Sequence, residues 1–157
     1  MTSFEKRALN PWLFGLFMLA KLPMGLLAGL RVKELNQERA VVTIPFKFLN
    51  KNPFESIYFA CLSMAAELSC GILAFRAVEE TAPNVSMLIT EMDAEFIKKA
   101  KGKISFTCAD SKEILAAVQN AQKSSEGINI SVSSCGKNEI GETVATFRFR
   151  WSFKARK

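Results

Sequence analysis

The sequence predicts an α+β domain in which a curved antiparallel sheet wraps around one long hydrophobic helix. Residues 56–75 are apolar around the whole circumference of a helix, and Glu67 is their only charged member, so this helix must be buried on all sides. Several other segments alternate apolar and polar residues with a period of two, which is typical of strands with one dry face. The dry face of such a sheet must be buried, and so must the whole surface of the helix, so we expect the sheet to enclose the helix.

The alternating segments predict five strands, at residues 41–48, 85–96, 103–108, 128–133 and 145–154. In the last of them the aromatic side chains of Phe147, Phe149 and Trp151 share one face, which indicates sheet core. A turn at residues 136–139 should join the last two strands as a hairpin.

One amphipathic helix interrupts the strands. It should run from Ser111 to about Lys123, with Ser111 as its cap. Its inner stripe is expected to consist of Ile114, Leu115, Val118 and Ala121.

The amino-terminal region is apolar from residue 11 to 30, with Lys21 as its only charge. Pro23 divides it into a helix over residues 10–21, capped by Asn10, and a shorter piece, and each is too short to span a bilayer. A signal peptide fits poorly because no Ala-x-Ala cleavage pattern follows. We expect one domain over residues 1–157, with an N-terminal helical segment at 1–30 and the central helix at 54–78, without integral membrane insertion and located in the cytoplasm.

The composition limits the available chemistry. Lys and Arg number 21 against 15 Asp and Glu, a net charge of +6, and the chain has no histidine. This excludes a Ser-His-Asp or Cys-His nucleophile and a histidine-ligated metal in the chain by itself. The four cysteines are spaced too irregularly for a zinc knuckle and indicate reduced core residues.

The positive charge is concentrated in two places. These are Lys98, Lys99, Lys101 and Lys103, and then Arg148, Arg150, Lys154, Arg156 and Lys157. A solvated surface is the commoner meaning of such runs. The alternative is a site for a phosphate-bearing small ligand such as a coenzyme, and Arg148 and Arg150 are expected on the outer face of the sheet.

The segment before the central helix carries a family resemblance. Residues 50–60 read Asn-Lys-Asn-Pro-Phe-Glu-Ser-Ile-Tyr-Phe-Ala, and Glu67 follows within the helix. In order and spacing this resembles the hot-dog acyl-CoA thioesterase superfamily, in particular the phenylacetate-pathway-type thioesterases and their uncharacterised thioesterase-like relatives. There an Asn-x-Asn segment leads into a Gly-Thr, a His and a Gly-Gly pair, and an acidic residue lies on the central helix.

The resemblance implies a site and a hot-dog fold. Glu67 would activate water or attack the thioester, and the backbone N–H of Phe59 would polarise the carbonyl oxygen. Ser63 would orient the carboxylate, while Asn52, Ser56, Tyr58 and Ala60 would line the substrate site. The chain departs from the family pattern where Tyr58, Phe59 and Ala60 stand in place of the His and the glycines. By the resemblance, the ring of Phe59 would then occupy space that the thioester needs.

The preferred function is hydrolysis of a small or fatty acyl-CoA by a homodimer or a dimer of dimers. Coenzyme A would be part of the substrate, with no metal, no other cofactor and no nucleic acid. The alternative is a catalytically inactive hot-dog protein that binds an acyl or lipid-like ligand. For Glu67 a structural ion pair at a subunit interface stays open, and turn formation is the favoured role of Asn50 and Asn52.

Overall fold

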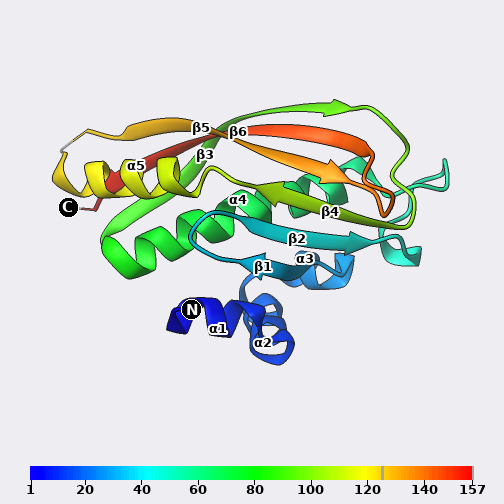
Figure 1. The fold of residues 1–157 in the computed structure, drawn as a ribbon, viewed down its shortest axis with the longest axis horizontal. Coiled ribbons are helices and arrows are strands. Elements are labelled where there is room, and N and C mark those ends of the chain that lie inside the picture. The colour runs from blue at the N-terminus through cyan, green and yellow to red at the C-terminus, as the bar shows by residue number, and fades with distance from the viewer. Residues whose placement is uncertain (125, 157) are drawn as a thin grey trace.

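The computed structural model describes residues 1–124 and 126–156, and it has one antiparallel sheet curved around a long helix (Figure 1). Within these residues the strands follow the order β1-β2-β4-β5-β6-β3. The strands are β1 (Arg31–Leu35), β2 (Ala40–Pro45), β3 (Val85–Phe96), β4 (Lys103–Cys108), β5 (Ile128–Lys137) and β6 (Thr143–Ala155). The helices are α1 (Ser3–Leu9), α2 (Pro11–Lys21), α3 (Pro23–Ala28), the 3-10 turn η1 (Phe48–Asn50), α4 (Phe59–Thr81) and α5 (Ser111–Lys123). This is the predicted hot-dog architecture.

Helix α4 is the predicted central helix, and it lies against the inner face of the sheet (Figure 1). Its length and composition would allow it to cross a membrane, yet most of it is buried inside the protein. Its start was predicted at residue 54, which is wrong, because α4 begins at Phe59. Residues 51 and 57 instead pair as an isolated bridge, and the side chain of Asn52 accepts hydrogen bonds from the backbone N–H groups of Phe54 and Ser56. These local bonds compete with a helix.

The inner face of β6 is confirmed, because Phe147, Phe149 and Trp151 are all buried. The hairpin turn lies two residues later than predicted, between Asn138 and Gly141, whose φ of 83° suits glycine. Gly136 belongs to β5 instead. There a Cβ would lie 2.4 Å from the ring of Phe106, so close packing requires the glycine.

Strand β2 is shorter than predicted because it ends at Pro45. The Asn50 side chain accepts a hydrogen bond from Lys47 N and donates to the carbonyls of Ala28 and Pro45, which turns the chain into η1. Phe48 therefore points to solvent, with 77% of its surface exposed. Turn formation by Asn50 and Asn52 is thus confirmed.

The amino-terminal helix was predicted correctly. Asn10 caps α2 by accepting hydrogen bonds from the N–H groups of Trp12 and Leu13, and Pro11 occupies the first turn. The preceding helix α1 and strand β1 were not predicted. Strand β1 extends the sheet beyond β2, and α1 and α2 lie outside this edge (Figure 1).

Helix α5 has the predicted bounds but a different cap and stripe. Asp110 holds the cap position but its carboxylate accepts a hydrogen bond from the N–H of Ser133 instead of capping the helix, and Ser111 is buried. The Ser111 hydroxyl accepts a hydrogen bond from Arg76, so its predicted capping role is wrong. Leu115 is partly exposed, and Ala117 takes its place in the buried stripe.

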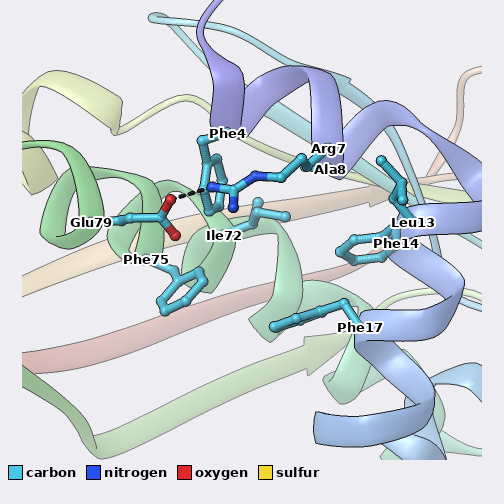
Figure 2. A pocket seen from close by; sticks show the side chains of 9 residues that line it. All are labelled: Phe4, Arg7, Ala8, Leu13, Phe14, Phe17, Ile72, Phe75 and Glu79. Atoms are coloured by element: carbon cyan, nitrogen blue, oxygen red, sulfur yellow. Dashed lines mark hydrogen bonds and ion pairs between the residues drawn. The ribbon is translucent and has the colours of Figure 1, made fainter.

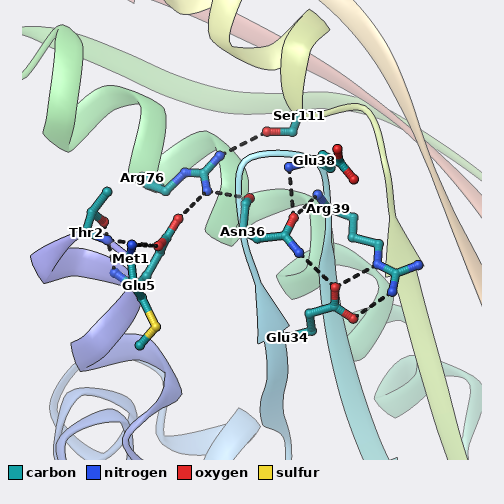
Figure 3. A network of polar contacts seen from close by, with 9 residues as sticks. All are labelled: Met1, Thr2, Glu5, Glu34, Asn36, Glu38, Arg39, Arg76 and Ser111. Atoms are coloured by element: carbon teal, nitrogen blue, oxygen red, sulfur yellow. Dashed lines mark hydrogen bonds and ion pairs between the residues drawn. The ribbon is translucent and has the colours of Figure 1, made fainter.

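A buried ion pair fastens α1 to α4 (Figure 3). The Arg76 guanidinium lies 3.1 Å from the Glu5 carboxylate and also donates to the carbonyl of Asn36 and to Ser111, 3.0 Å away. Thr2 and Glu5 form a capping box that holds the carboxylate in place. Four segments that are distant in the sequence therefore meet at one guanidinium.

Strand β3 departs from the one-dry-face pattern. Its second half is exposed, and the side chains of Leu88, Met92 and Phe96 are 66%, 49% and 48% exposed. It pairs with β6 on one side and ends the strand order, which leaves its outer edge open. The four cysteines are free thiols, as predicted, and three of them are buried.

Candidate functional site

The Glu67 carboxyl group occupies a gap that Gly71 leaves in the next turn of α4. One carboxylate oxygen lies 2.6 Å from the point where a Cβ on Gly71 would stand, and the ring of Trp151 lies 3.6 Å from the same point. Among the residues that the structure describes, no group donates a hydrogen bond to this carboxylate or pairs with it. Burial removes water from the charged form and raises the pKa of Glu67 to about 7. A carboxyl in this state can exchange a proton near neutral pH.

The amino end of α4 offers free backbone donors. Tyr58 precedes the helix without a side-chain cap, and its N–H donates to the carbonyl of Asn50. Within the described part of the chain, the N–H groups of Phe59 and Ala60 reach no acceptor. Unpaired N–H groups at a helix start favour a negatively charged oxygen.

An open groove of about 590 Å³ lies beside this helix start. Asn52, Ser56, Tyr58 and Phe59 line it together with residues 96–100. The Phe59 ring packs against Tyr58 and against Phe96 of β3, with ring centres 4.9 and 6.1 Å apart. The groove thus brings together four of the seven predicted site residues. Its wall includes Lys98 and Lys99, which the sequence marked only as a basic run.

Asn52 and Ser56 are engaged with each other. The amide nitrogen of Asn52 donates to the Ser56 hydroxyl at 3.0 Å, and the amide oxygen accepts from the N–H of Phe54 at 2.9 Å. These bonds shape the loop that leads into α4.

Ser63 and Glu67 lie farther along α4 than the groove. The Ser63 hydroxyl donates to the carbonyl of Phe59 at 3.0 Å, so it is turned back along the helix instead of toward Glu67. Ala60 follows Phe59 in the first turn. The predicted residues therefore form two groups, one at the start of α4 and in the loop before it, and one at Ser63 and Glu67 farther along the helix.

A second cavity lies between the amino-terminal helices and α4 (Figure 2). It encloses about 320 Å³, and its walls are mostly aromatic and aliphatic. Phe4, Phe14 and Phe17 come from α1 and α2, while Ile72 and Phe75 come from α4. An ion pair between Arg7 and Glu79 lies at its rim (Figure 2). The sequence did not indicate this cavity because α1 was not predicted.

Three residues that shape the candidate site were not predicted from the sequence. Gly71 makes room for the carboxylate, the ring of Trp151 lies beside the same gap, and Phe96 packs against the Phe59 ring. The only local signal was a glycine four residues after an acid on one helix. Among the described residues, no cluster of three or more Cys, Asp or Glu side chains could hold a metal ion.

Comparisons with known proteins agree with the fold. A Pseudomonas aeruginosa structure described as a probable thioesterase has a TM-score of 0.78 at 20% identity, covering 96% of this chain and 99% of its own. A Chlorobaculum tepidum protein of unknown function has a TM-score of 0.78 at 17% identity, and the match covers 95% of this chain and 99% of that protein. A Haemophilus influenzae thioesterase has a TM-score of 0.63 at 11% identity, and the match covers 89% of this chain and 88% of that protein.

The TM-scores show a shared fold, the hot-dog fold. No curated protein matches the chain. A family model described as a domain of unknown function, DUF4442, matches residues 10–153, and the chain belongs to this family.

Proposed function

We propose that this protein hydrolyses the thioester of a small or fatty acyl-CoA, with Glu67 as the reacting acid. The observation that carries the proposal is the Glu67 carboxyl group in the gap at Gly71, which has no partner among the described residues and whose pKa burial raises to about 7. In its ionised form Glu67 takes a proton from water while the water oxygen attacks the carbonyl carbon. The carbon–sulfur bond then breaks, and the coenzyme leaves as a thiolate that takes up a proton. Attack by the carboxylate itself, followed by hydrolysis of the anhydride, is the covalent version of this step.

The free N–H groups of Phe59 and Ala60 would stabilise the negative charge that develops on the carbonyl oxygen. Phe59 precedes Glu67 by eight residues, which is about 12 Å along a helix. The Glu67 carboxylate points farther away still, toward Gly71. One chain therefore cannot bring both groups to a single carbonyl.

We accordingly place the site between two subunits. In a homodimer, or a dimer of dimers, Glu67 of one subunit would face the free N–H groups at the start of α4 in the other subunit. The open edge of β3, with its exposed apolar side chains, offers a pairing surface for such a dimer. The acyl-CoA would enter through the groove at Tyr58 and Phe59, where Lys99 is available to the phosphates of the coenzyme.

Turnover of a panel of acyl-CoA thioesters tests the proposal. We expect the wild type to release coenzyme A and Glu67→Gln to lose at least a hundredfold in rate, in the range of a lost general base. The rate should rise as the pH increases through about 7, because only ionised Glu67 accepts a proton. The matched control is Glu38→Gln, an exposed carboxylate in the turn between β1 and β2, which should keep the wild-type rate. Equal rates for wild type and Glu67→Gln, or no turnover by the wild type, would contradict hydrolysis.

The second candidate is an acyl or lipid-like ligand carrier without hydrolysis. The apolar cavity of about 320 Å³ favours it, since pockets of this size hold small apolar ligands. The Phe59 ring beside the helix start favours it as well. A rise in melting temperature with fatty acids or acyl-CoA, without product, would support this function. Filling the cavity by Ile72→Phe should then abolish the stabilisation.

A further inference from the structure

The outer side of α2 is apolar and faces solvent. Trp12, Leu16 and Leu19, spaced four and three residues apart, lie on one side of the helix and are 85%, 64% and 61% exposed. The opposite side, with Phe14 and Met18, is buried against the protein. The next helix, α3, also exposes Met24 and Leu27, by 64% and 52%. We call these five exposed side chains the α2–α3 patch. A gathering of large exposed apolar side chains is uncommon on the surface of a monomer and marks an interaction site.

Most of the net positive charge comes from the same third of the chain. Residues 1–51 hold eight Lys and Arg against three Glu, a net charge of +5 out of the total of +6. Within this third, Glu5 pairs with Arg76, Glu34 with Arg39, and Arg7 with Glu79. The part of the chain that carries the α2–α3 patch is therefore net positive.

Four of these cations adjoin the two helices that carry the patch. Lys21 ends α2, and Arg31 and Lys33 line a groove along the other side of α2, the side of Phe14 and Met18. The ammonium group of Lys47 lies beside Gly29, directly after α3. In the described part of the chain none of the four forms an ion pair.

An anionic lipid surface matches this combination. Aliphatic side chains and a tryptophan enter the boundary between headgroups and acyl chains, and the surrounding cations contact lipid phosphates. A second copy of the chain on the same patch would bring two sets of unpaired cations together, which opposes association. Helix α2 has only 11 residues, so it can lie in the membrane surface but cannot span it.

We propose that the α2–α3 patch docks the protein onto anionic membranes, with Trp12, Leu16 and Leu19 inserted at the level of the headgroups. The site lies at the β1 edge of the sheet (Figure 1), whereas the open β3 edge ends the strand order on the other side. Docking therefore leaves the proposed subunit contact free, and it does not depend on the hydrolase function.

Tryptophan fluorescence with lipid vesicles tests the proposal on the full chain. The chain has two tryptophans, and Trp151 is only 3% exposed, so a shift of emission to shorter wavelength reports Trp12. We expect this shift, and flotation of the protein, with phosphatidylcholine vesicles that contain one third phosphatidylglycerol. Pure phosphatidylcholine or high salt should weaken both. No shift and no flotation with the anionic vesicles would overturn the proposal.

Two matched pairs of variants separate the contributions. Leu16→Ser with Leu19→Ser should weaken partitioning at least tenfold, while Ile140→Ser, which is 81% exposed in the β5–β6 turn, should not. Arg31→Ala should weaken it about fivefold, the loss expected for one cation near the surface, while Lys112→Ala on α5 should not. Equal losses in both members of a pair would refute docking by this patch. If the leucine variant instead abolished self-association and left vesicle binding unchanged, the patch would be a contact between copies of this chain.

Discussion

Replacing Glu67 by glutamine should make the protein more stable at alkaline pH while it removes the reacting carboxyl. The carboxyl has a pKa of about 7 in the folded protein against an ordinary value of 4.5. The unfolded chain therefore releases this proton near pH 4.5, whereas the folded chain keeps it to about pH 7. Between these values the folded state binds more protons, so stability falls as the pH rises. The full penalty is about 3 kcal/mol and is present above pH 7.

Urea denaturation of the wild type and Glu67→Gln across this pH window measures the penalty. Their free energies of unfolding should differ little near pH 4.5, because glutamine resembles the protonated acid. The difference should grow in favour of the variant to about 3 kcal/mol near pH 8. Glu38→Gln, at an exposed site, serves as the control for general charge effects. A variant that is less stable than the wild type near pH 8, or a difference that does not depend on pH, would refute the idea that Glu67 is held as a destabilised acid.

Three further substitutions test the packing around α4 and the helix propensity of α2. Gly71→Ala places a methyl group 2.6 Å from a Glu67 oxygen, so the carboxyl group must move and we expect slower thioester turnover. Alanine also favours the helix over glycine by up to about 1 kcal/mol, so the slower turnover should not come from unfolding. Unchanged kinetics would contradict the expected displacement of Glu67. Arg76→Ala leaves Glu5 buried without its partner and should lower the free energy of unfolding in urea by about 3–5 kcal/mol, with partial recovery when Glu5→Gln is added. Gly15→Ala meets no heavy atom within 4 Å and should raise stability by about 1 kcal/mol, so a lower melting temperature would count against it.

The sequence predicted best those elements whose pattern is long. Helix α4 has 23 residues in an almost unbroken apolar run, and strand β6 has 13 residues that repeat their alternation several times. Strand β1 and helix α1 have only five and seven residues, too few for a period to stand out. The start of α4 was misplaced because apolar residues before Phe59 continue the helical pattern, while the side chain of Asn52 holds that segment in a loop.

The candidate site was predictable in residue type and not in geometry. An acid on an otherwise apolar helix is visible in the sequence, and Glu67 stands out for that reason. The direction of its side chain depends on the gap at Gly71 and on Trp151, which is 84 residues away in the chain. Ser63 has two possible partners on the same helix, and in the structure it donates to the carbonyl of Phe59. Choices of this kind are decided by tertiary packing, which a periodic pattern does not contain.

The absence of histidine is compatible with thioester chemistry in particular. A thiol loses its proton near pH 8.5, so a thiolate leaves a tetrahedral intermediate without much help from a general acid. An alkoxide is far more basic and needs a proton as it leaves, and histidine commonly donates that proton as a general acid. A site with one carboxyl near pKa 7 and backbone donors can therefore activate water for a thioester and yet fail with an oxygen ester. We expect the protein to cleave an acyl thioester at least a hundredfold faster than the oxygen ester of the same acyl group, and similar rates for the two would show that another proton donor takes part.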